Sequence, residues 1–275
     1  MQNKILGVIG HPIHHSLSPT LHEFFIAKAG LEASYHAFDV APEDIESAIK
    51  GAKALGLTGL NVTVPHKQNV MPFLDEIDDF AQKVGAVNTI HFKGNTASGW
   101  NTDVPGLIKN LAANNVTLDG KDIVILGAGG AARATVMAAK NSGAGSIAIY
   151  NRTPSRAEAL AADFDSEWLP SIEKECLPDD CIIINTTSVG MHPHRAACPL
   201  QMHHFRKKRT FVDLVYNPIE TTFLKNARAC GAQCVDGLGM LIYQGAIALG
   251  IWMGRTIEID RDYEQLRQLL LSRIS

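Results

Sequence analysis

Short apolar runs alternate along most of the chain with segments in which apolar residues recur every three or four positions. The runs are typical of buried strands, and the longer spacing is typical of amphipathic helices. This alternation predicts an α/β protein with largely parallel sheets, because parallel strands are usually joined by crossover helices. We expect strands near residues 4–9, 34–38, 59–64, 87–92, 122–126, 146–150, 181–185, 210–214 and 233–235. We expect helices near residues 19–29, 43–55, 66–84, 239–253 and 260–273, and another that contains Leu107 and Leu111.

Local signals mark the ends of some of these elements. Ser18 followed by Pro19 is typical of a helix N-cap and first turn, and Gly30 is suited to end that helix. Residues 92–96 have the composition of a hairpin turn. The first helix should therefore begin at Ser18, and a β-hairpin should close the first group of strands.

The chain has 275 residues, which is enough for two domains, each with its own core. Its composition, 46% hydrophobic and 19% charged, is typical of a soluble globular protein. The net charge of -3 is small and the basic residues are dispersed. We therefore expect no nucleic-acid partner.

The apolar segments are too short for a membrane protein. Residues 1–10 are broken by Gly7 and fall short of the apolar region of a signal peptide. The longest apolar stretch, 241–254, is interrupted by Gln244 and is well below the roughly 20 residues that cross a bilayer. A cytoplasmic protein without a membrane partner is expected.

The cysteines predict neither a disulfide framework nor a zinc site, because their number is odd and no two have the Cys-x-x-Cys spacing. We expect reduced thiols, most of them packed in the core. The five are Cys176, Cys181, Cys198, Cys230 and Cys234.

Two groups of histidines also give no metal prediction. His11, His14 and His15 lie on a turn without an acidic partner nearby in the sequence. His192 and His194 flank a proline and fit a variable loop better than a metal site.

A glycine-rich turn at residues 127–131 follows the strand near 122–126 and precedes an alanine-rich helix. Bare backbone at Gly127 and Gly129 lets a pyrophosphate approach, Ala132 permits close packing of helix on strand, and the helix N-terminus offers free amide donors. Strand, turn and helix occur in the order of a dinucleotide-binding motif, so we predict a nucleotide cofactor. A tight strand–helix turn without a ligand is the alternative.

Two arginines follow the next strand. A classical NAD site carries an acidic residue there for the ribose hydroxyls, whereas this chain has Arg152 and Arg156. Guanidinium groups bind a phosphate dianion through two hydrogen bonds, so the position favours the 2′-phosphate of NADP. Two solvated arginines beside a helix start are the alternative interpretation.

The strand near 59–64 ends in groups that can hold and protonate a hydroxylated substrate. Asn61 supplies an amide, Thr63 a hydroxyl and Lys67 an ammonium. Pro65 has no backbone donor, so the strand should end there and a helix should open at Lys67. A solvated lysine after a strand end is the simpler alternative.

Ser16 and Ser18 place two hydroxyls beside a helix N-terminus, where amide donors and the helix dipole attract an anion such as a carboxylate. Capping alone explains Ser18 but not Ser16. Two further short strands end in polar groups, at 88–89 and 101–103. Each of these could be turn chemistry by itself.

Taken together, these motifs closely resemble those of the shikimate dehydrogenase family, in the same order and over nearly the whole chain. The matching segments are 16–19, 61–67, 88–89, 101–103, 127–131, 151–153, 185–191, 213–218 and 237–244. The resemblance implies reversible reduction of 3-dehydroshikimate to shikimate by NADPH, a step toward chorismate and the aromatic amino acids. It also implies a substrate-binding domain of residues 1–103 and 238–275 and a Rossmann-type NADP domain of residues 104–237, with the active site in the cleft between them.

The resemblance also implies a role for each matching residue, with Lys67 and Asp103 as the catalytic pair and no metal. Ser16 and Ser18 would hold the substrate carboxylate. Ring hydroxyls or the reacting oxygen would be contacted by Asn61, Thr63, Lys67, Asn88, Asp103, Tyr216 and Gln244. The cofactor would be lined by Gly127, Ala128, Gly129, Gly130, Ala131, Asn151, Arg152, Thr153, Arg156, Leu214 and Gly237. Which member of the catalytic pair donates the proton stays open, as does the choice between monomer and homodimer.

The helix near 239–253 departs from the family pattern. Gly245, Leu249 and Met253 stand where the family usually has alanine, phenylalanine and threonine. Glycine weakens a helix by about 1 kcal/mol relative to alanine. The departures leave Gln244 in place, and they leave open how tightly the substrate pocket is packed and how fast the enzyme turns over.

Three other functions share part of this pattern. A quinate/shikimate dehydrogenase with broader substrate and cofactor use has the same motifs, although the arginines favour the narrower enzyme. A regulator that binds NADPH without turnover would not need Lys67 and Asp103. A dehydrogenase acting on folate or glutamyl substrates does not fit the paired serines or the segment 61–67.

Overall fold

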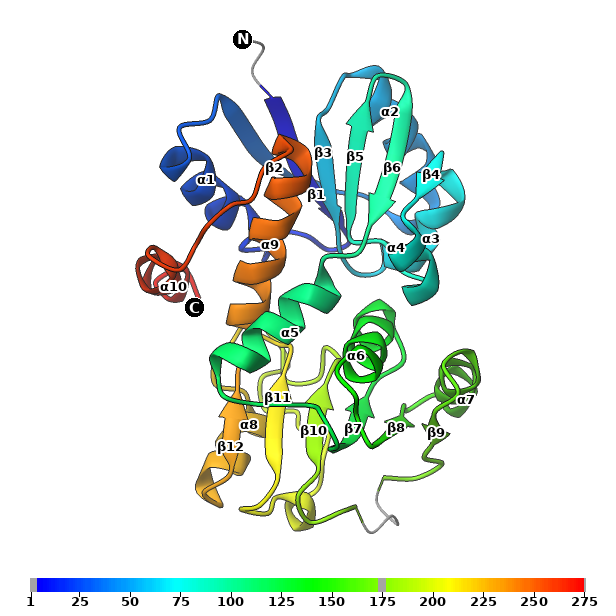
Figure 1. Ribbon diagram of the computed structural model, residues 1–275, viewed down its shortest axis with the longest axis vertical. Coiled ribbons are helices and arrows are strands. Elements are labelled where there is room, and N and C mark those ends of the chain that lie inside the picture. Colours follow the sequence, from blue (N-terminus) through cyan, green and yellow to red (C-terminus); the bar gives the residue numbers. More distant parts are fainter. Residues whose placement is uncertain (1–3, 173–176, 275) are drawn as a thin grey trace. The chain divides into compact units, whose positions relative to one another are not determined.

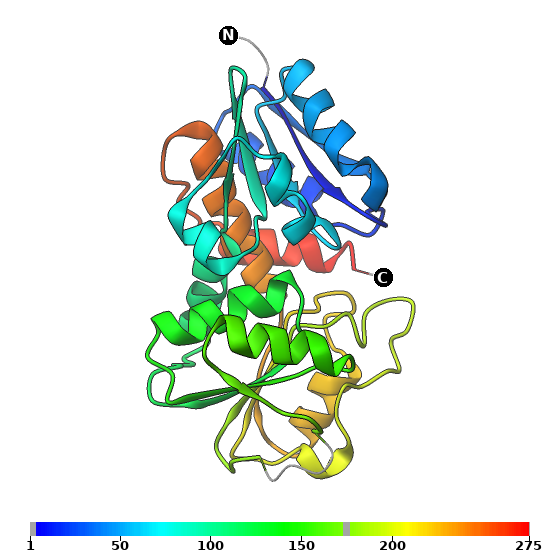
Figure 2. The ribbon, with the colours of Figure 1, turned by 90° about the vertical axis from the view of Figure 1, so that its right-hand side faces the viewer.

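The computed structural model describes residues 4–172 and 177–274, which form two compact units. The first unit contains the chain up to Gly106 together with Leu241–Arg273, and the second contains Leu107–Met240. Each unit has its own six-stranded sheet. Figure 1 follows the chain through both units, and Figure 2 shows each sheet from the side.

The sheet of the first unit is mixed, with the strand order β2-β1-β3-β5-β6-β4. β1 is parallel to β2 and β3, whereas β5 is antiparallel to β3 and β6. Helices α2 and α9 lie on opposite faces of this sheet (Figures 1 and 2). The elements are β1 (Lys4–Gly10), α1 (Ser18–Lys28), β2 (Ala33–Asp39), α2 (Ile45–Ala54), β3 (Gly59–Val62), α3 (His66–Asn69), β4 (Glu76–Ile77), α4 (Asp79–Val84), β5 (Thr89–Lys93), β6 (Thr96–Trp100), α5 (Asp103–Ala113, which continues into the second unit), α9 (Leu238–Met253) and α10 (Tyr263–Leu271), with 3-10 turns at Pro42–Asp44 and Met71–Phe73.

The sheet of the second unit is parallel throughout, with the order β12-β11-β10-β7-β8-β9. Its central strands are buried apolar runs because helices cover both faces. Side chains of α8 complete the core on one face, where Phe223 and Leu224 pack with Phe211. The elements are β7 (Asp122–Leu126), α6 (Gly130–Asn141), β8 (Ser146–Tyr150), α7 (Pro154–Asp163), β9 (Glu167–Trp168), β10 (Ile182–Asn185), a 3-10 turn (Met202–His204), β11 (Thr210–Asp213), α8 (Thr222–Ala229) and β12 (Gln233–Val235).

The α/β architecture is confirmed, and most predicted elements lie within a few residues of their predicted ranges. The predicted hairpin is also confirmed, since Lys93 pairs with Thr96 across a two-residue turn. The prediction of largely parallel sheets holds for the second unit, whereas the hairpin makes the first sheet mixed.

The single helix predicted for residues 66–84 is wrong. The chain instead forms α3, a 3-10 turn, the short strand β4 and α4. Pro72 lies in the 3-10 turn and cannot donate a backbone hydrogen bond, which prevents a continuous helix. Asp78 then starts α4 anew, because its side chain accepts hydrogen bonds from the amides of Phe80 and Ala81.

The predicted N-cap at Ser18 is also wrong. Ser18 is the first residue of α1, and Leu17 occupies the capping position. The backbone N–H of Ser18 donates to Ser16 Oγ at 3.2 Å, so Ser16 orders the chain just before the helix. Gly30 follows the end of the helix with φ +57°, as expected of a glycine that ends a helix.

In the part of the chain that the structure describes, no helix is long and apolar enough to cross a membrane. Over the same residues, no group of three or more metal-ligating side chains is positioned to hold a metal ion. Cys181, Cys198, Cys230 and Cys234 are free thiols, and Cys176 lies outside the described residues.

Candidate active site

Lys67 and Asp103, which are 36 residues apart in sequence, form an ion pair in the first unit. Lys67 Nζ donates to Asp103 Oδ2 at 2.6 Å. The Lys67 side chain is 15% exposed and the Asp103 side chain 5%, so the carboxylate is buried while the ammonium still reaches the surface. An ammonium held in this way can stabilise negative charge on a substrate oxygen and pass a proton to it.

Asn88, just before β5, connects this pair to Thr102 at the start of α5 and to Gln244 on α9. Its Nδ2 donates to Asp103 Oδ1 and to Thr102 Oγ1, both at 2.9 Å, and lies 3.4 Å from Gln244 Oε1 on α9. Its Oδ1 accepts from the backbone N–H of Thr102 at 2.7 Å. Asn88, Thr102 and Asp103 are all at most 3% exposed. The polar groups are therefore held by one another in a fixed arrangement.

The start of α5 places Asp103 in this arrangement. Asn101 Oδ1 accepts hydrogen bonds from the backbone N–H groups of Asp103 and Val104. Asn101 Nδ2 donates to the carbonyl of Ala86 at 2.8 Å, which ties the helix start to the segment before β5. Neither Asn101 nor Thr102 was among the predicted site residues. Their occurrence beside Asp103 was the available sequence signal, but it is equally typical of a helix cap.

Asn61 is buried at the end of β3, next to Thr89 on the neighbouring strand β5. Its Oδ1 accepts from the Tyr35 hydroxyl at 2.7 Å, and its Nδ2 lies 3.3 Å from Thr89 Oγ1. Thr63 follows β3 and is half-buried. Its backbone N–H donates to the carbonyl of Ile9, so the chain stays aligned with β1 beyond the last residue of the strand.

The loop that carries Ser16 lies against the same strand exit. The backbone N–H of His11 donates to the carbonyl of Val64 at 3.0 Å. Ser16 is half-buried, and Ser18 is buried at the first turn of α1. The first amide of α1, that of Ser18, already donates to Ser16 Oγ, and Pro19 has no N–H. The two serine hydroxyls and the helix dipole can still attract an anion.

His11 and His14 both contact Asp39, at the end of β2. His11 Nδ1 is 2.7 Å and His14 Nε2 is 3.2 Å from a carboxylate oxygen of Asp39. The sequence alone showed no acidic partner for these histidines, because Asp39 is distant along the chain. The contact fastens the loop of Ser16 to the edge strand of the sheet.

In the second unit, the glycine loop lies between β7 and α6. Gly127 has φ +121°, a conformation that suits glycine, and a Cβ atom there would collide with the Thr186 hydroxyl. Gly129 is exposed, and a Cβ atom there would meet nothing within 4 Å. Within the described residues, no side chain caps the first amides of α6. The open space at Gly129 and these amide donors fit a pyrophosphate.

Arg152, Thr153 and Arg156 are exposed around the start of α7, and Asn151 is half-buried beside them. Asn151 Nδ2 donates to the carbonyl of Thr153 at 3.0 Å, which shapes the turn. Neither arginine forms an ion pair among the residues that the structure describes. Both guanidinium groups are therefore available to a phosphate.

The structure thus gathers the predicted residues into two sets, one in each unit. Ser16, Ser18, Asn61, Thr63, Lys67, Asn88, Asp103 and Gln244 belong to the first unit. Tyr216 belongs to the second unit with the predicted cofactor residues, and both Tyr216 and Leu214 are half-buried there.

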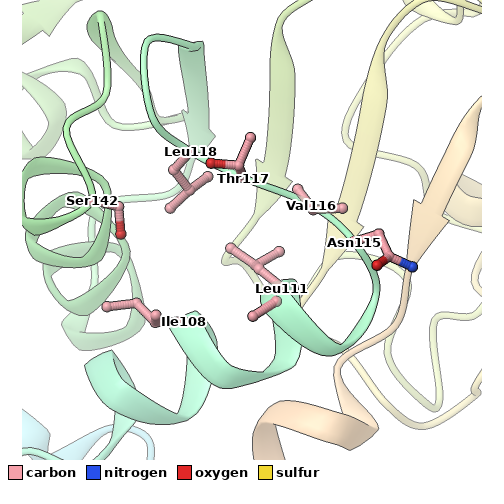
Figure 3. A pocket seen from close by; sticks show the side chains of 8 residues that line it. Ile108, Leu111, Asn115, Val116, Thr117, Leu118 and Ser142 are labelled. Carbon is pink, nitrogen blue, oxygen red and sulfur yellow. The ribbon is translucent and has the colours of Figure 1, made fainter.

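A cavity of about 450 Å³ in the second unit contains none of the predicted residues. Figure 3 shows its lining, which comes from α5, the segment that follows α5, and Ser142. Most of the labelled side chains are apolar, and the polar ones are the neutral Asn115, Thr117 and Ser142. This lining has no charged group that could bind an anion or transfer a proton.

Models of three parts of one family match the chain. The description "Shikimate dehydrogenase substrate binding domain" matches residues 8–90, "Shikimate / quinate 5-dehydrogenase" matches 110–228, and "Shikimate 5'-dehydrogenase C-terminal domain" matches 237–267. The NADP(+) shikimate dehydrogenase of Geobacillus kaustophilus is 44% identical over 273 residues, which cover 98% of each chain. The chain belongs to the shikimate dehydrogenase family.

Solved shikimate dehydrogenase structures agree with this assignment. The Thermus thermophilus enzyme, in complex with NADP(H) and shikimate, is 38% identical and has a TM-score of 0.87 over 96% of this chain and 99% of its own. The Listeria monocytogenes enzyme, in complex with shikimate and NAD, is 32% identical and has a TM-score of 0.84 over 98% and 96% of the two chains. The predicted family and fold are therefore confirmed.

One departure from the shikimate dehydrogenase pattern has a packing explanation. A Cβ atom at Gly245 would lie 2.5 Å from Leu21 Cδ2 and 3.5 Å from His22 Nε2. Leu21 and His22 are fully buried, and His22 stacks on Tyr35 with a centroid distance of 4.2 Å. Burial lowers the pKa of His22 to about 3, so the ring is neutral. Gly245 allows α9 to approach α1 closely, so this part of the core is tightly packed.

We expect the Gly245→Ala variant to be less stable than the wild type, although alanine favours a helix. Overpacking a core costs about 1–3 kcal/mol, which outweighs the gain in helix propensity of about 1 kcal/mol. Thermal unfolding should show a melting temperature lower by about 3 °C. In a Leu21→Ala background, where space is available, the same substitution should raise the melting temperature. A rise in the wild-type background would contradict the packing explanation.

Proposed function

We propose that the protein is an NADP-dependent oxidoreductase that reversibly reduces 3-dehydroshikimate to shikimate. The observation that carries this proposal is the Lys67–Asp103 ion pair, in which Asp103 is held by Asn88 within a buried polar cluster that also contains Gln244. NADPH supplies the hydride when it is bound. The protein must then orient the ketone and stabilise the charge that develops on its oxygen.

Lys67 and Asp103 are suited to that task. The Lys67 ammonium can donate a hydrogen bond or a proton to the reacting oxygen. Asp103 holds Lys67 at 2.6 Å, and its position is fixed in turn by Asn88 at 2.9 Å. We assign the pair to proton transfer as a unit, because the two groups are hydrogen-bonded to each other.

We assign the substrate carboxylate to the hydroxyls of Ser16 and Ser18. The support is the position of both serines at the start of α1 and the contact between the Ser16 loop and the end of β3. We assign ring hydroxyls to amide and hydroxyl groups of the first unit, namely Asn61, Thr63, Asn88 and Gln244. We also assign Tyr216, which belongs to the second unit, to the substrate.

Ser16→Ala should raise the KM for shikimate by about tenfold, with a modest loss of kcat. A hydrogen bond to a charged group contributes about 1.5–3 kcal/mol, and loss of uniform substrate binding appears in KM. Ser98→Ala is the matched control, because the Ser98 hydroxyl donates to Glu76 at an exposed site of the same unit. An unchanged KM in the Ser16 variant would place the carboxylate elsewhere.

The second unit is assigned to NADP. The residues that would hold the pyrophosphate are Gly127 to Ala131, and those that would hold the 2′-phosphate are Arg152 and Arg156, with Asn151 and Thr153 shaping the turn. Leu214 and Gly237 would line the remainder of the site. The support is the open backbone at Gly129, the uncapped start of α6 and, among the described residues, the absence of an ion pair at Arg152 or Arg156.

These assignments give residues 1–103 and 238–275 to the substrate and residues 104–237 to NADP, with Tyr216 as a substrate residue within the second range. We place the enzyme in the cytoplasm as a monomer or homodimer. Within this scheme, the chain acts on the route to chorismate and the aromatic amino acids.

A second candidate is a quinate/shikimate dehydrogenase with broader cofactor use. It is favoured by the family model described as "Shikimate / quinate 5-dehydrogenase" and by the Listeria relative, which was crystallised with NAD. Arg152 and Arg156 argue for the narrower enzyme. Steady-state rates with shikimate and quinate, each with NADP+ and NAD+, separate the two candidates.

A further inference from the structure

Asp213, the last residue of β11, is a fully buried carboxylate that the proposed chemistry does not use. Its Oδ1 accepts from Asn185 Nδ2 at 2.9 Å and from the backbone N–H of Val215 at 3.0 Å. Its Oδ2 accepts from the Thr221 hydroxyl at 2.6 Å. The three donors belong to three segments: the end of β10, the loop after β11, and the residue that caps α8. One side chain therefore joins three parts of the second unit.

The first of these segments reaches the glycine loop. Asn185 Oδ1 accepts from both the backbone N–H and the hydroxyl of Thr187, at 3.1 and 2.7 Å. Thr186 donates to the carbonyl of Leu126 through its backbone N–H at 2.9 Å and its hydroxyl at 2.8 Å. The same hydroxyl occupies the space next to Gly127 that a Cβ atom would need. A shift of Asn185 would consequently move the wall behind the glycine loop.

The second segment contains Leu214 and Tyr216. The backbone N–H of Leu214 donates to the carbonyl of Asn185 at 2.9 Å. On the other side, the carbonyl of Leu214 is so close to Gly237 that a Cβ atom there would collide with it. Leu214 thus lies between Asn185 and Gly237, and Asp213 bonds to Asn185 and to Val215, the residue after Leu214.

We propose that Asp213 is a positioning residue for the cofactor site, holding segments 185–187 and 214–216 in the places where they meet NADP. The inference rests on the assignment of NADP to this unit. All three partners donate to Asp213, which suits an ionised carboxylate because it only accepts hydrogen bonds. Without it, three buried donors would lose their acceptor, and each such loss is costly.

The pKa of Asp213 leaves its carboxylate ionised at pH 8. Burial raises the pKa of Asp213 to about 6, and the hydrogen bonds from Thr221, Val215 and Asn185 act in the opposite direction. Cys198 is a titratable neighbour, and burial raises the pKa of its thiol, with a further contribution from Asp213. Below about pH 6 one Asp213 oxygen would carry a proton that faces the present donor to that oxygen, so we expect the network to loosen there.

The test measures NADPH affinity by isothermal titration calorimetry in Asp213→Ala and Asp213→Asn. Asparagine has the same shape and can still accept from Asn185 and Val215, whereas alanine accepts from none. At pH 8 we expect the Kd for NADPH to rise about tenfold in the alanine variant and by less than about threefold in the asparagine variant. The kcat of the alanine variant at saturating cofactor should stay within about threefold, because Lys67 and Asp103 are untouched.

The pH profile separates positioning from a general structural role. Lowering the pH from 8 to 5.5 should weaken NADPH binding more in the wild type than in Asp213→Asn, where residue 213 cannot titrate. The 2′-phosphate of NADPH also titrates, with a pKa near 6. Its contribution is the same for the wild type and for Asp213→Asn, so the difference between the two profiles does not contain it. Parallel pH profiles would overturn the proposal, as would a folded alanine variant with an unchanged Kd.

If Asp213→Ala does not fold, Thr221→Val and Thr221→Ser take its place. Valine removes the hydroxyl that donates to Asp213, and serine keeps both that bond and the cap of α8. We expect the Kd for NADPH to rise in folded Thr221→Val and to stay near the wild-type value in Thr221→Ser. Equal Kd values in the two variants would overturn the proposal. Calorimetry needs no turnover, so wild type that binds NADPH but does not oxidise shikimate would refute the proposed reaction and not the role of Asp213.

Discussion

Replacing Lys67 with alanine should lower kcat for shikimate oxidation by at least about a hundredfold, while the KM for shikimate changes little. The expected loss is that of a general acid-base group positioned at the reacting oxygen. Lys67 Nζ is the donor that Asp103 holds at 2.6 Å, and its side chain remains 15% exposed, so it can reach a bound substrate. Steady-state kinetics with shikimate and NADP+ give both constants.

This prediction needs a control for stability, because removing Lys67 leaves the buried Asp103 with Asn88 as its remaining side-chain partner among the described residues. Circular dichroism and the melting temperature would show whether the variant is folded. Lys53→Ala is the matched control, since Lys53 pairs with Asp75 at 2.6 Å in the same unit but away from Asn88 and Asp103. Near-normal kcat in a folded Lys67 variant would remove Lys67 from the mechanism.

Replacing both Arg152 and Arg156 with alanine should lower kcat/KM for NADP+ by about a hundredfold and leave kcat/KM for NAD+ nearly unchanged. Charge-assisted hydrogen bonds to a phosphate contribute roughly 1.5–3 kcal/mol each, and NAD+ has no 2′-phosphate to lose them. Both arginines are exposed at the start of α7. The preference for NADP+ over NAD+ should therefore largely disappear.

Arg206→Ala is the control for this pair. Arg206 is an exposed arginine of the same unit, 3.7 Å from Asp179, and its loss should affect neither cofactor. If the double variant retains the wild-type preference for NADP+, the 2′-phosphate is recognised by other groups. If the wild type itself shows no preference, the broader quinate/shikimate enzyme becomes the better assignment.

Much of the fold could be predicted because strands in the second unit are uninterrupted apolar runs and the turns carry glycine or proline at their characteristic positions. The prediction of one helix over 66–84 was wrong because the apolar spacing of this segment resembles that of a helix. Pro72 instead ends the helical hydrogen bonding and divides the segment. The prediction that Ser18 is the N-cap was wrong because Ser16, two residues earlier, accepts the hydrogen bond from the Ser18 backbone N–H through its Oγ.

The site was predicted as a set of residue types, but its internal contacts could not be. Lys67 and Asp103 could be proposed as a pair from the resemblance, whereas the role of Asn88 in holding Asp103 depends on how β5 and α5 meet. Gly245 appeared to weaken its helix, because nothing in the local sequence shows that Leu21 fills the space beside it. Contacts between distant segments depend on the packed core, which periodicity does not specify.

The most direct test of the proposed activity is the initial rate at which the purified protein reduces NADP+ with shikimate, followed by the absorbance of reduced nicotinamide. Parallel reactions replace shikimate with quinate and NADP+ with NAD+. We predict steady turnover with shikimate and NADP+, and a kcat/KM for this combination that exceeds the other three by about tenfold or more. Binding of NADPH without any oxidation of shikimate would contradict the account.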